Sequence, residues 1–183
     1  SRARSRQVEV GPSSIGGCHR RLWHELAGTE HTNDGDKLGA ICGTFIHAGI
    51  EEALRRQDPF GDIYELEISV EHDGLRGNVD CYDKVNRMVI DWKTNKKGGA
   101  RYFGKGNRQQ IWQIQLYGWL LTQNGYVVED VSLVGIPRDG KMKDILVHTE
   151  PYDPAIAQEA LDHLKVEQRQ HSFFNLTFLF CVG

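Results

Sequence analysis

Three consecutive segments with the alternation of β-strands constrain the fold of this chain most. From Ile63 to Val70, apolar and polar residues alternate, as they do in a strand with one buried face. Leu75 to Tyr82 and Met88 to Lys93 follow as a second and a third strand, after turns at Glu71–Gly74 and Asp83–Arg87. Connections this short predict three antiparallel strands in succession.

Helical patterns and two further strands surround these three. The helices are expected at Ser13 to Leu26, Thr44 to Arg56, Gln109 to Leu121 and Pro154 to His171, and the added strands at Val127 to Ile136 and Ile145 to His148. The order is therefore helix, helix, three strands, helix, two strands, helix. Such an order predicts an α/β fold in which a central mixed β-sheet is flanked by helices.

The length of 183 residues suits one domain with its own core. We expect a single domain over residues 1–183, with an N-terminal helical part at about 1–60, a core that carries the chemistry at about 61–150 and a C-terminal helix and tail at about 151–183. No apolar run is long enough to cross a bilayer, and no signal-peptide core follows the basic N-terminus. These features favour a cytoplasmic protein without membrane contacts.

Asp80, Asp91 and Lys93 are the residues whose pattern points to chemistry. Asp91 and Lys93 are two apart in a strand and project from the same face, which Asp80 can reach from the neighbouring strand. Two adjacent carboxylates repel unless a cation lies between them, so the pair predicts a site for one or two Mg²⁺ or Mn²⁺ ions. Lys93 could orient or deprotonate a water and offset charge that develops on a phosphate.

His47, on the second expected helix, would add a neutral imidazole, a ligand that suits Mn²⁺ and is tolerated beside Mg²⁺. Glu51 lies one helical turn later on the same face. Taken singly, a D-x-K triplet, a lone helical histidine and an aspartate near a turn are each more often structural. Together they predict metal-activated attack of water on a phosphodiester.

Four motifs then carry a resemblance: Gly43-Thr-Phe-Ile-His47, Gly77-Asn-Val-Asp80, Asp91-Trp-Lys-Thr94 and Gln113-Ile-Gln-Leu-Tyr117. They occur in the order found in RecB-like nucleases, so the sequence resembles that family and its phage and CRISPR-associated exonucleases. The resemblance implies a PD-(D/E)XK, restriction-endonuclease-like core. It also implies a metal bound by His47, Asp80, Asp91 and the backbone carbonyl of Trp92, with Lys93 as the catalytic lysine.

The family's glutamine and tyrosine correspond to Gln113 and Tyr117, which are four apart on one expected helix. They share a face and could both approach the DNA backbone or the catalytic edge of the sheet, or they could serve helix packing. An extra acidic residue sometimes found on the first strand of this fold could be Glu65 or Glu67. The pattern does not choose between these two, and neither is included among the expected metal ligands.

A basic, glycine-rich stretch follows the acidic motif. We expect its cations to contact DNA: Lys96, Lys97, Arg101, Lys105 and Arg108, with Tyr102 and Phe103 among them. The net charge of −3 does not itself indicate a nucleic-acid-binding protein, and on charge alone a solvated loop is the favoured interpretation. The position directly after Asp91 and Lys93 favours phosphate contact.

Two of the four cysteines, Cys18 and Cys181, lie near the ends of the chain, and no C-x-x-C pair is present. The stretch from Ser13 to Cys18 resembles the opening of family members that bind an iron–sulfur cluster through one N-terminal and three C-terminal cysteines. Here the chain stops at Gly183 before any further cysteine, so four-cysteine ligation is incomplete. We expect an iron–sulfur cluster only if the chain is truncated.

These features lead to one favoured function and two alternatives. The favoured one is a Mg²⁺- or Mn²⁺-dependent deoxyribonuclease, an exonuclease by family analogy, acting in recombination, repair or phage DNA processing in a bacterial or phage-infected cell. Its partners would be DNA and a recombination or helicase protein, and the oligomeric state is left open. The alternatives are a non-cutting DNA-binding adaptor on the same fold, and a small-molecule metallohydrolase, which lacks the second histidine cluster expected of that class.

Overall fold

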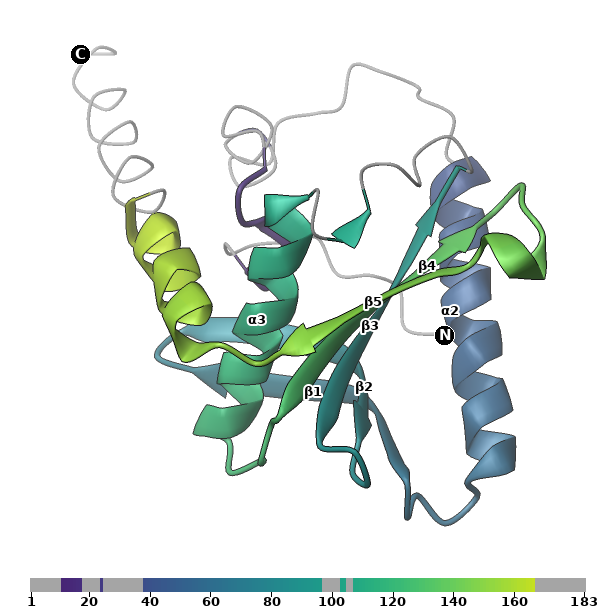
Figure 1. Ribbon diagram of the computed structural model, residues 1–183, viewed down its shortest axis with the longest axis horizontal. Helices are drawn as coiled ribbons and strands as arrows, with labels where there is room; N and C mark the ends of the chain where they lie inside the picture. Colours follow the sequence, from purple (N-terminus) through teal and green to yellow (C-terminus); the bar gives the residue numbers. More distant parts are fainter. Residues whose placement is uncertain (1–10, 18–23, 25–37, 97–102, 105–106, 167–183) are drawn as a thin grey trace, which may run out of the picture.

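A five-stranded mixed sheet is the centre of the molecule (Figure 1). The computed structural model describes residues 11–17, 24, 38–96, 103–104 and 107–166. The strands are β1 (Tyr64–His72), β2 (Leu75–Asp83), β3 (Met88–Asn95), β4 (Asp130–Pro137) and β5 (Leu146–Pro151). They lie side by side in chain order.

All strand pairs are antiparallel except β3 and β4, which run parallel. A parallel pair needs a long crossover, and α3 (Arg108–Gln123) lies within it. The side chain of Asn107 caps this helix by accepting a hydrogen bond from the backbone N–H of Gln110. The predicted meander, the mixed sheet and the α/β class are therefore confirmed.

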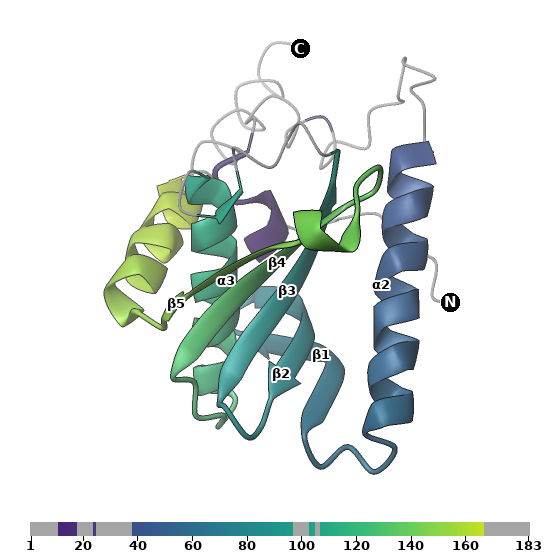
Figure 2. The ribbon, with the colours of Figure 1, turned by 45° about the vertical axis from the view of Figure 1, so that its right-hand side comes forward.

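Helices cover both faces of the sheet (Figures 1 and 2). The helix α2 (Leu38–Gln57) lies on one side, whereas α3 and the helix over residues 154–166 lie on the other. The main core forms on the α3 side, where Leu116 and Leu120 are fully buried together with Val79 and Leu133 from the strands. Two 3₁₀ helices complete the described elements, η1 (Pro12–Ser14) and η4 (Met142–Asp144).

The contact of α2 with the sheet is narrow, because Gly43 is its only buried residue. A Cβ atom at Gly43 would lie 2.8 Å from Thr94 Oγ1 on β3. The missing side chain thus allows the helix to approach β3 closely. The other residues of α2 are therefore partly or fully exposed.

Some boundaries differ from the prediction. The helix expected from Thr44 begins at Leu38, and the strand expected from Val127 begins at Asp130. The helix expected from Ser13 does not start there, because Pro12–Ser14 is a 3₁₀ turn and Gly16 adopts a positive φ of 64°. Residues 167–171 of the last expected helix lie outside the described residues. No helix in the described ranges is long and apolar enough to span a membrane.

Candidate active site

Asp80, Asp91 and Lys93 come together where β2 pairs with β3. The pairing of Cys81 with Ile90 brings Asp80 next to Asp91. Asp80 Oδ2 accepts a hydrogen bond of 2.8 Å from the backbone N–H of Trp92, and Lys93 Nζ lies 2.8 Å from Asp91 Oδ2. The two carboxylates and the lysine ammonium thus form one cluster, as the sequence pattern predicted.

His47 reaches this cluster from α2. Its Nδ1 lies 3.7 Å from Asp80 Oδ1, and its ring meets the indole of Trp92 edge-on with centroids 6.3 Å apart. The close approach of Gly43 to Thr94 holds α2 against β3 one turn before His47. Gly43 therefore allows α2 to lie close enough to β3 for His47 to reach Asp80.

Asp91 has the most unusual environment of the site. The residue is 3% exposed. Burial first, and then the neighbouring charge of Asp80, raise the pKa of Asp91 to about 6, against the lowering effects of Lys93 and His47. Its Oδ2 atom makes no hydrogen bond of good geometry within the described residues, although Lys93 Nζ is close. Its counter-charge among the described residues is the Lys93 ammonium.

Gln113 and Tyr117 lie behind the carboxylates rather than on the surface. Each residue is 5% exposed, and Gln113 Nε2 donates a hydrogen bond of 3.1 Å to the Tyr117 hydroxyl. Burial, and next the charge of Asp91, raise the pKa of Tyr117 above its usual value, so the phenol stays protonated. Gly77 provides the space, since a Cβ atom there would lie within 3.0 Å of both Tyr117 and Leu120.

The structure also separates the two glutamates that the sequence left open. Glu65 accepts a hydrogen bond of 2.8 Å from the Tyr126 hydroxyl. Glu67 stands opposite Asp80 in the register, between the pairs of Leu66 with Cys81 and Ile68 with Val79, and has a positive φ of 55°. A left-handed backbone inside a strand is strained for glutamate, and such strain gathers at functional sites. The register therefore places Glu67, rather than Glu65, next to Asp80.

The expected DNA-contacting cations fall into three groups. Lys96 is exposed just after β3, whereas Lys97, Arg101 and Lys105 lie outside the described residues, as do Cys18 and Cys181. Arg108 forms an ion pair with Glu159 and lies over the Trp112 ring at 4.6 Å. Its guanidinium thus joins α3 to the helix over residues 154–166, a contact that sequence spacing does not reveal.

The end of the basic stretch is held over the sheet by glycines. Phe103 packs on Gly135, where a Cβ atom would lie 2.8 Å from the phenyl ring, and Gly135 pairs with Lys93 in the register. Gly104, at a positive φ of 65°, packs on His148 in the same way. Phe103 and Gly104 are therefore held against the sheet, and Phe103 packs on the residue of β4 that pairs with Lys93.

The donor set fits a divalent metal in chemistry. Among the described residues, no three His, Cys, Asp or Glu side chains gather closely enough to form a ready-made metal cluster. However, the carboxylates of Asp80 and Asp91 are hard oxygen donors, His47 adds an imidazole, and Asp91 Oδ2 is buried without a hydrogen bond.

Comparison with solved structures shows that several exonucleases have this fold. A phage-related exonuclease from Haemophilus somnus 129PT matches 87% of this chain and 82% of its own with a TM-score of 0.63 and 12% identity. An alkaline exonuclease from Laribacter hongkongensis, LHK-Exo, matches 96% of this chain and 93% of its own with a TM-score of 0.60 and 15% identity. A putative exonuclease from Eubacterium rectale matches 93% and 85% with a TM-score of 0.56 and 11% identity.

At these identities the likeness establishes a common fold. No family model and no curated protein matches the chain. The expectation that the chain resembles exonucleases in architecture is thus confirmed by structure, whereas residue roles depend on the geometry described above.

Proposed function

We propose that this chain is a divalent-metal-dependent deoxyribonuclease that removes nucleotides from DNA ends. The observation that carries the proposal is the cluster of Asp80, Asp91 and Lys93 across β2 and β3, in a fold shared with exonucleases. One structure of the similar LHK-Exo is a complex with dAMP, which supports a DNA substrate here. A protein that only binds DNA does not require a buried carboxylate next to a lysine, an arrangement that costs stability.

Each residue of the site has a role in this proposal. One or two Mg²⁺ or Mn²⁺ ions, held by His47, Asp80, Asp91 and the carbonyl of Trp92, would activate water and neutralise phosphate charge. Lys93, which is 26% exposed at its side chain, can reach a bound phosphate while Asp91 keeps its ammonium oriented. Glu67 can add a further carboxylate from β1. The buried, hydrogen-bonded pair of Gln113 and Tyr117 would support the carboxylate of Asp91 from α3.

The test is cleavage of end-labelled linear single-stranded DNA, linear duplex DNA and covalently closed circles with Mg²⁺, Mn²⁺ or EDTA. We expect degradation of linear DNA that needs the metal and spares circles. Lys93→Ala should lower the rate by about 10²- to 10³-fold, as removal of a transition-state charge partner does in other hydrolases. Lys143→Ala removes a lysine from η4 and should cut normally, which controls for loss of positive charge.

Three other outcomes contradict parts of the proposal. Cleavage of closed circles would make the enzyme an endonuclease. If the protein binds DNA in EDTA but does not cut it with either metal, it is a DNA-binding adaptor and not a nuclease. Equal activity of wild type and Lys93→Ala would show that the cluster on β2 and β3 is not the site.

A further inference from the structure

Arg138, directly after β4, differs from the other arginines that the structure describes. Each of the others is exposed and forms an ion pair with a glutamate: Arg55, Arg56, Arg76, Arg87 and Arg108. Arg138 is half-buried, and no carboxylate in the described ranges forms an ion pair with it. A partly desolvated cation without a counter-charge costs stability, so its presence favours a role in binding an anion.

The guanidinium of Arg138 is held between the end of β4 and the first turn of α2. Its Nη1 donates a hydrogen bond to the carbonyl of Gly39, and a Cβ atom at Gly39 would lie 2.6 Å from that nitrogen. The backbone N–H of Arg138 donates a hydrogen bond of 2.9 Å to the carbonyl of Asn95, which extends the pairing of β4 with β3. The bond to Gly39 is the one that the guanidinium makes within the described residues, so most of its five N–H donors remain for a ligand.

Lys96 is placed beside Arg138 by the parallel register of β3 and β4. The last pair of the two strands is Asn95 with Pro137, so Lys96 and Arg138 are the next residues along the chain on either side. Thr94 faces α2, and alternation places Lys96 on that same side of the sheet. Lys96 is exposed and has no ion pair in the described part of the chain. Like charges on neighbouring strands about 4.8 Å apart repel each other, and an anion laid across them would neutralise both.

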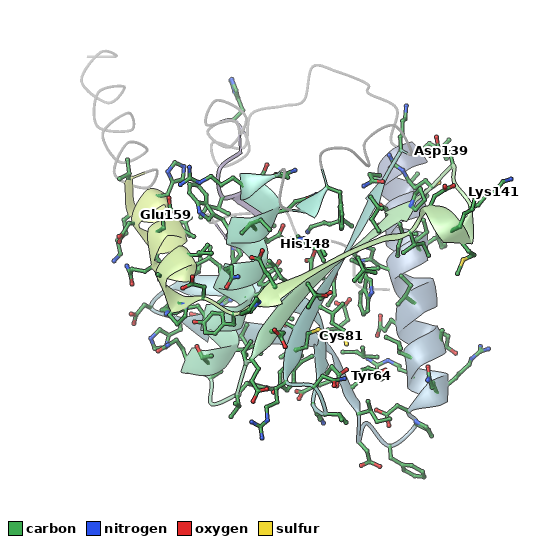
Figure 3. All side chains as sticks on the ribbon, viewed as in Figure 1. Tyr64, Cys81, Asp139, Lys141, His148 and Glu159 are labelled. Carbon is green, nitrogen blue, oxygen red and sulfur yellow. The ribbon has the colours of Figure 1, made fainter. Side chains whose placement is uncertain are left out.

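The two cations lie at the end of the strand that carries the candidate active site. The pairs of β2 with β3 end before Asp91, whereas the pairs of β3 with β4 continue to Asn95. The part of β3 that is not paired with β2 therefore carries Lys93 and leads to Lys96. Figure 3 shows the turn at Asp139 beside the start of α2, at this same end of the sheet.

Distances along β3 and α2 relate the two cations to the candidate active site. Lys96 follows Lys93 by three residues, about 10 Å of strand. Gly39, which contacts Arg138, precedes His47 by eight residues of α2, about 12 Å of helix. Each length corresponds to about three to four nucleotides of a stacked strand at roughly 3.4 Å each. A DNA strand with one phosphate at Lys93 can therefore lay its backbone across Lys96 and Arg138.

We propose that Arg138 and Lys96 bind the phosphate backbone of the DNA strand being cut, about three to four nucleotides from the scissile bond. This site rests on the proposed nuclease function and adds to it Arg138, which no sequence pattern indicated. The planar guanidinium suits two phosphate oxygens, and the lysine ammonium adds a compact charge. Because both groups contact the backbone rather than the bases, they position the strand without sequence preference.

The test is the salt dependence of DNA binding by the full chain. The affinity for a fluorescein-labelled single-stranded oligodeoxythymidylate is measured by anisotropy in EDTA, between about 50 and 200 mM NaCl. Each phosphate contact on a single strand contributes about 0.7 to the slope of log K against log salt concentration. Lys96→Gln and Arg138→Gln should therefore each reduce this slope by about 0.7 and weaken binding most at low salt.

The choice of variants separates phosphate contact from a structural effect. Lys96→Gln breaks no side-chain hydrogen bond or ion pair among the described residues, whereas Arg138→Gln also removes the bond to Gly39, so circular dichroism checks its helix content. Lys165→Gln is the matched control. Lys165 is likewise an exposed lysine without an ion pair in the described ranges, but its helix over residues 154–166 lies on the other side of the sheet from α2 (Figure 2). Its slope should equal that of wild type.

If Lys96→Gln keeps the wild-type slope, the site is overturned, whatever the result for Arg138→Gln. An equal reduction in Lys165→Gln also overturns it, since binding would then follow net charge rather than position. Cleavage of linear DNA with Mg²⁺ is measured in parallel. When wild type cuts DNA but shows no salt-dependent affinity in EDTA, this site alone fails, because two cations need no metal to bind phosphates. When wild type neither cuts nor binds DNA, the proposed function fails, and this site fails with it.

Discussion

At Asp91, the stability of the fold and the proposed chemistry have opposite requirements. It is buried, lies beside Asp80, and lacks a well-formed hydrogen bond to Oδ2 in the described part of the chain. An ionised group in such a place destabilises the folded protein until a cation arrives. In the proposed function the same arrangement would make Asp91 a strong metal ligand, so that the instability of the metal-free protein and its metal affinity would have one cause.

Asp91→Asn should therefore stabilise the metal-free protein at high pH. The pKa of Asp91 is raised from 3.8 to about 6, so the folded state binds this proton more tightly than the unfolded state. The penalty is absent below the ordinary pKa, grows between the two values and is complete above about pH 6, where it reaches about 3 kcal/mol at 1.36 kcal/mol per unit. Urea unfolding of wild type and Asp91→Asn in EDTA at several pH values measures this difference in the free energy of unfolding.

The pH dependence distinguishes this cause from a general effect of the substitution. The gain of Asp91→Asn over wild type should shrink to nothing near pH 4, and saturating Mg²⁺ should reverse the order of stability by binding wild type. A variant that is less stable than wild type near pH 8 in EDTA would contradict the burial penalty.

The cluster could be predicted from the sequence because it depends on local geometry. A period of two places Asp91 and Lys93 on one face, and a short turn places Asp80 beside them. The choice between Glu65 and Glu67 could not be predicted, since both lie on one side of the alternation. The left-handed φ of Glu67 and the hydrogen bond from Tyr126 to Glu65 both arise from tertiary structure.

At the scale of the elements, α2 is a helix held by one glycine. Gly43→Val should push α2 away from β3, because its side chain would overlap Thr94 Oγ1, 2.8 Å from the Cβ position. His47 would then lose its place beside Asp80. We expect kcat/KM for linear DNA to fall by at least about 10-fold, the effect of misplacing a catalytic group by a fraction of a turn. Circular dichroism should show the helix content retained.

Gly49→Val is the matched control, since a Cβ atom at Gly49 meets nothing within 4 Å. The same replacement of glycine by a β-branched side chain occurs there on the exposed surface. If both variants lost activity equally, helix propensity rather than the contact with Thr94 would be the cause.

The start of α2 could not be placed from the sequence for a related reason. Gly39 and Gly43 resemble loop residues, yet in the structure each lies in the helix at a close contact, with Arg138 and with Thr94. The partners are about fifty to one hundred residues away in the chain, beyond any local pattern. The strands and α3, by contrast, have strong periodicity of their own and were predicted to within a few residues.

At the scale of the whole molecule, Gln115 joins α3, β5 and the helix over residues 154–166. It is fully buried, its Nε2 donates hydrogen bonds to Glu150 Oε1 and the carbonyl of Pro151, and its Oε1 accepts from the N–H of Asp153. The second carboxylate oxygen of Glu150 contacts His148. The Gln115 amide thus provides hydrogen-bond partners for polar groups where β5 ends and the last described helix begins.

Gln115→Leu should destabilise the protein by about 2–4 kcal/mol, because it leaves buried polar groups around Asp153 without partners. Urea denaturation at neutral pH measures the loss. Gln158→Leu is the control, since Gln158 bonds Asp162 on the exposed side of its helix and should change stability by no more than about 0.5 kcal/mol. Equal stability of wild type and Gln115→Leu would show that water replaces the amide.

The position of the carboxylates on one hairpin has a consequence for the order in which the site is assembled. Asp80, Asp91 and Lys93 all lie on β2 and β3, joined by a turn that the Asp83 carboxylate closes by accepting from Val85 and Asn86. Hairpins form within about 1–10 μs, whereas contacts distant in sequence close later. We therefore expect the acidic pair to meet in the refolding chain before α2 brings His47 and α3 brings Tyr117 to it. We also expect a divalent cation that neutralises this pair to raise the rate of folding, in addition to its proposed role in cutting DNA.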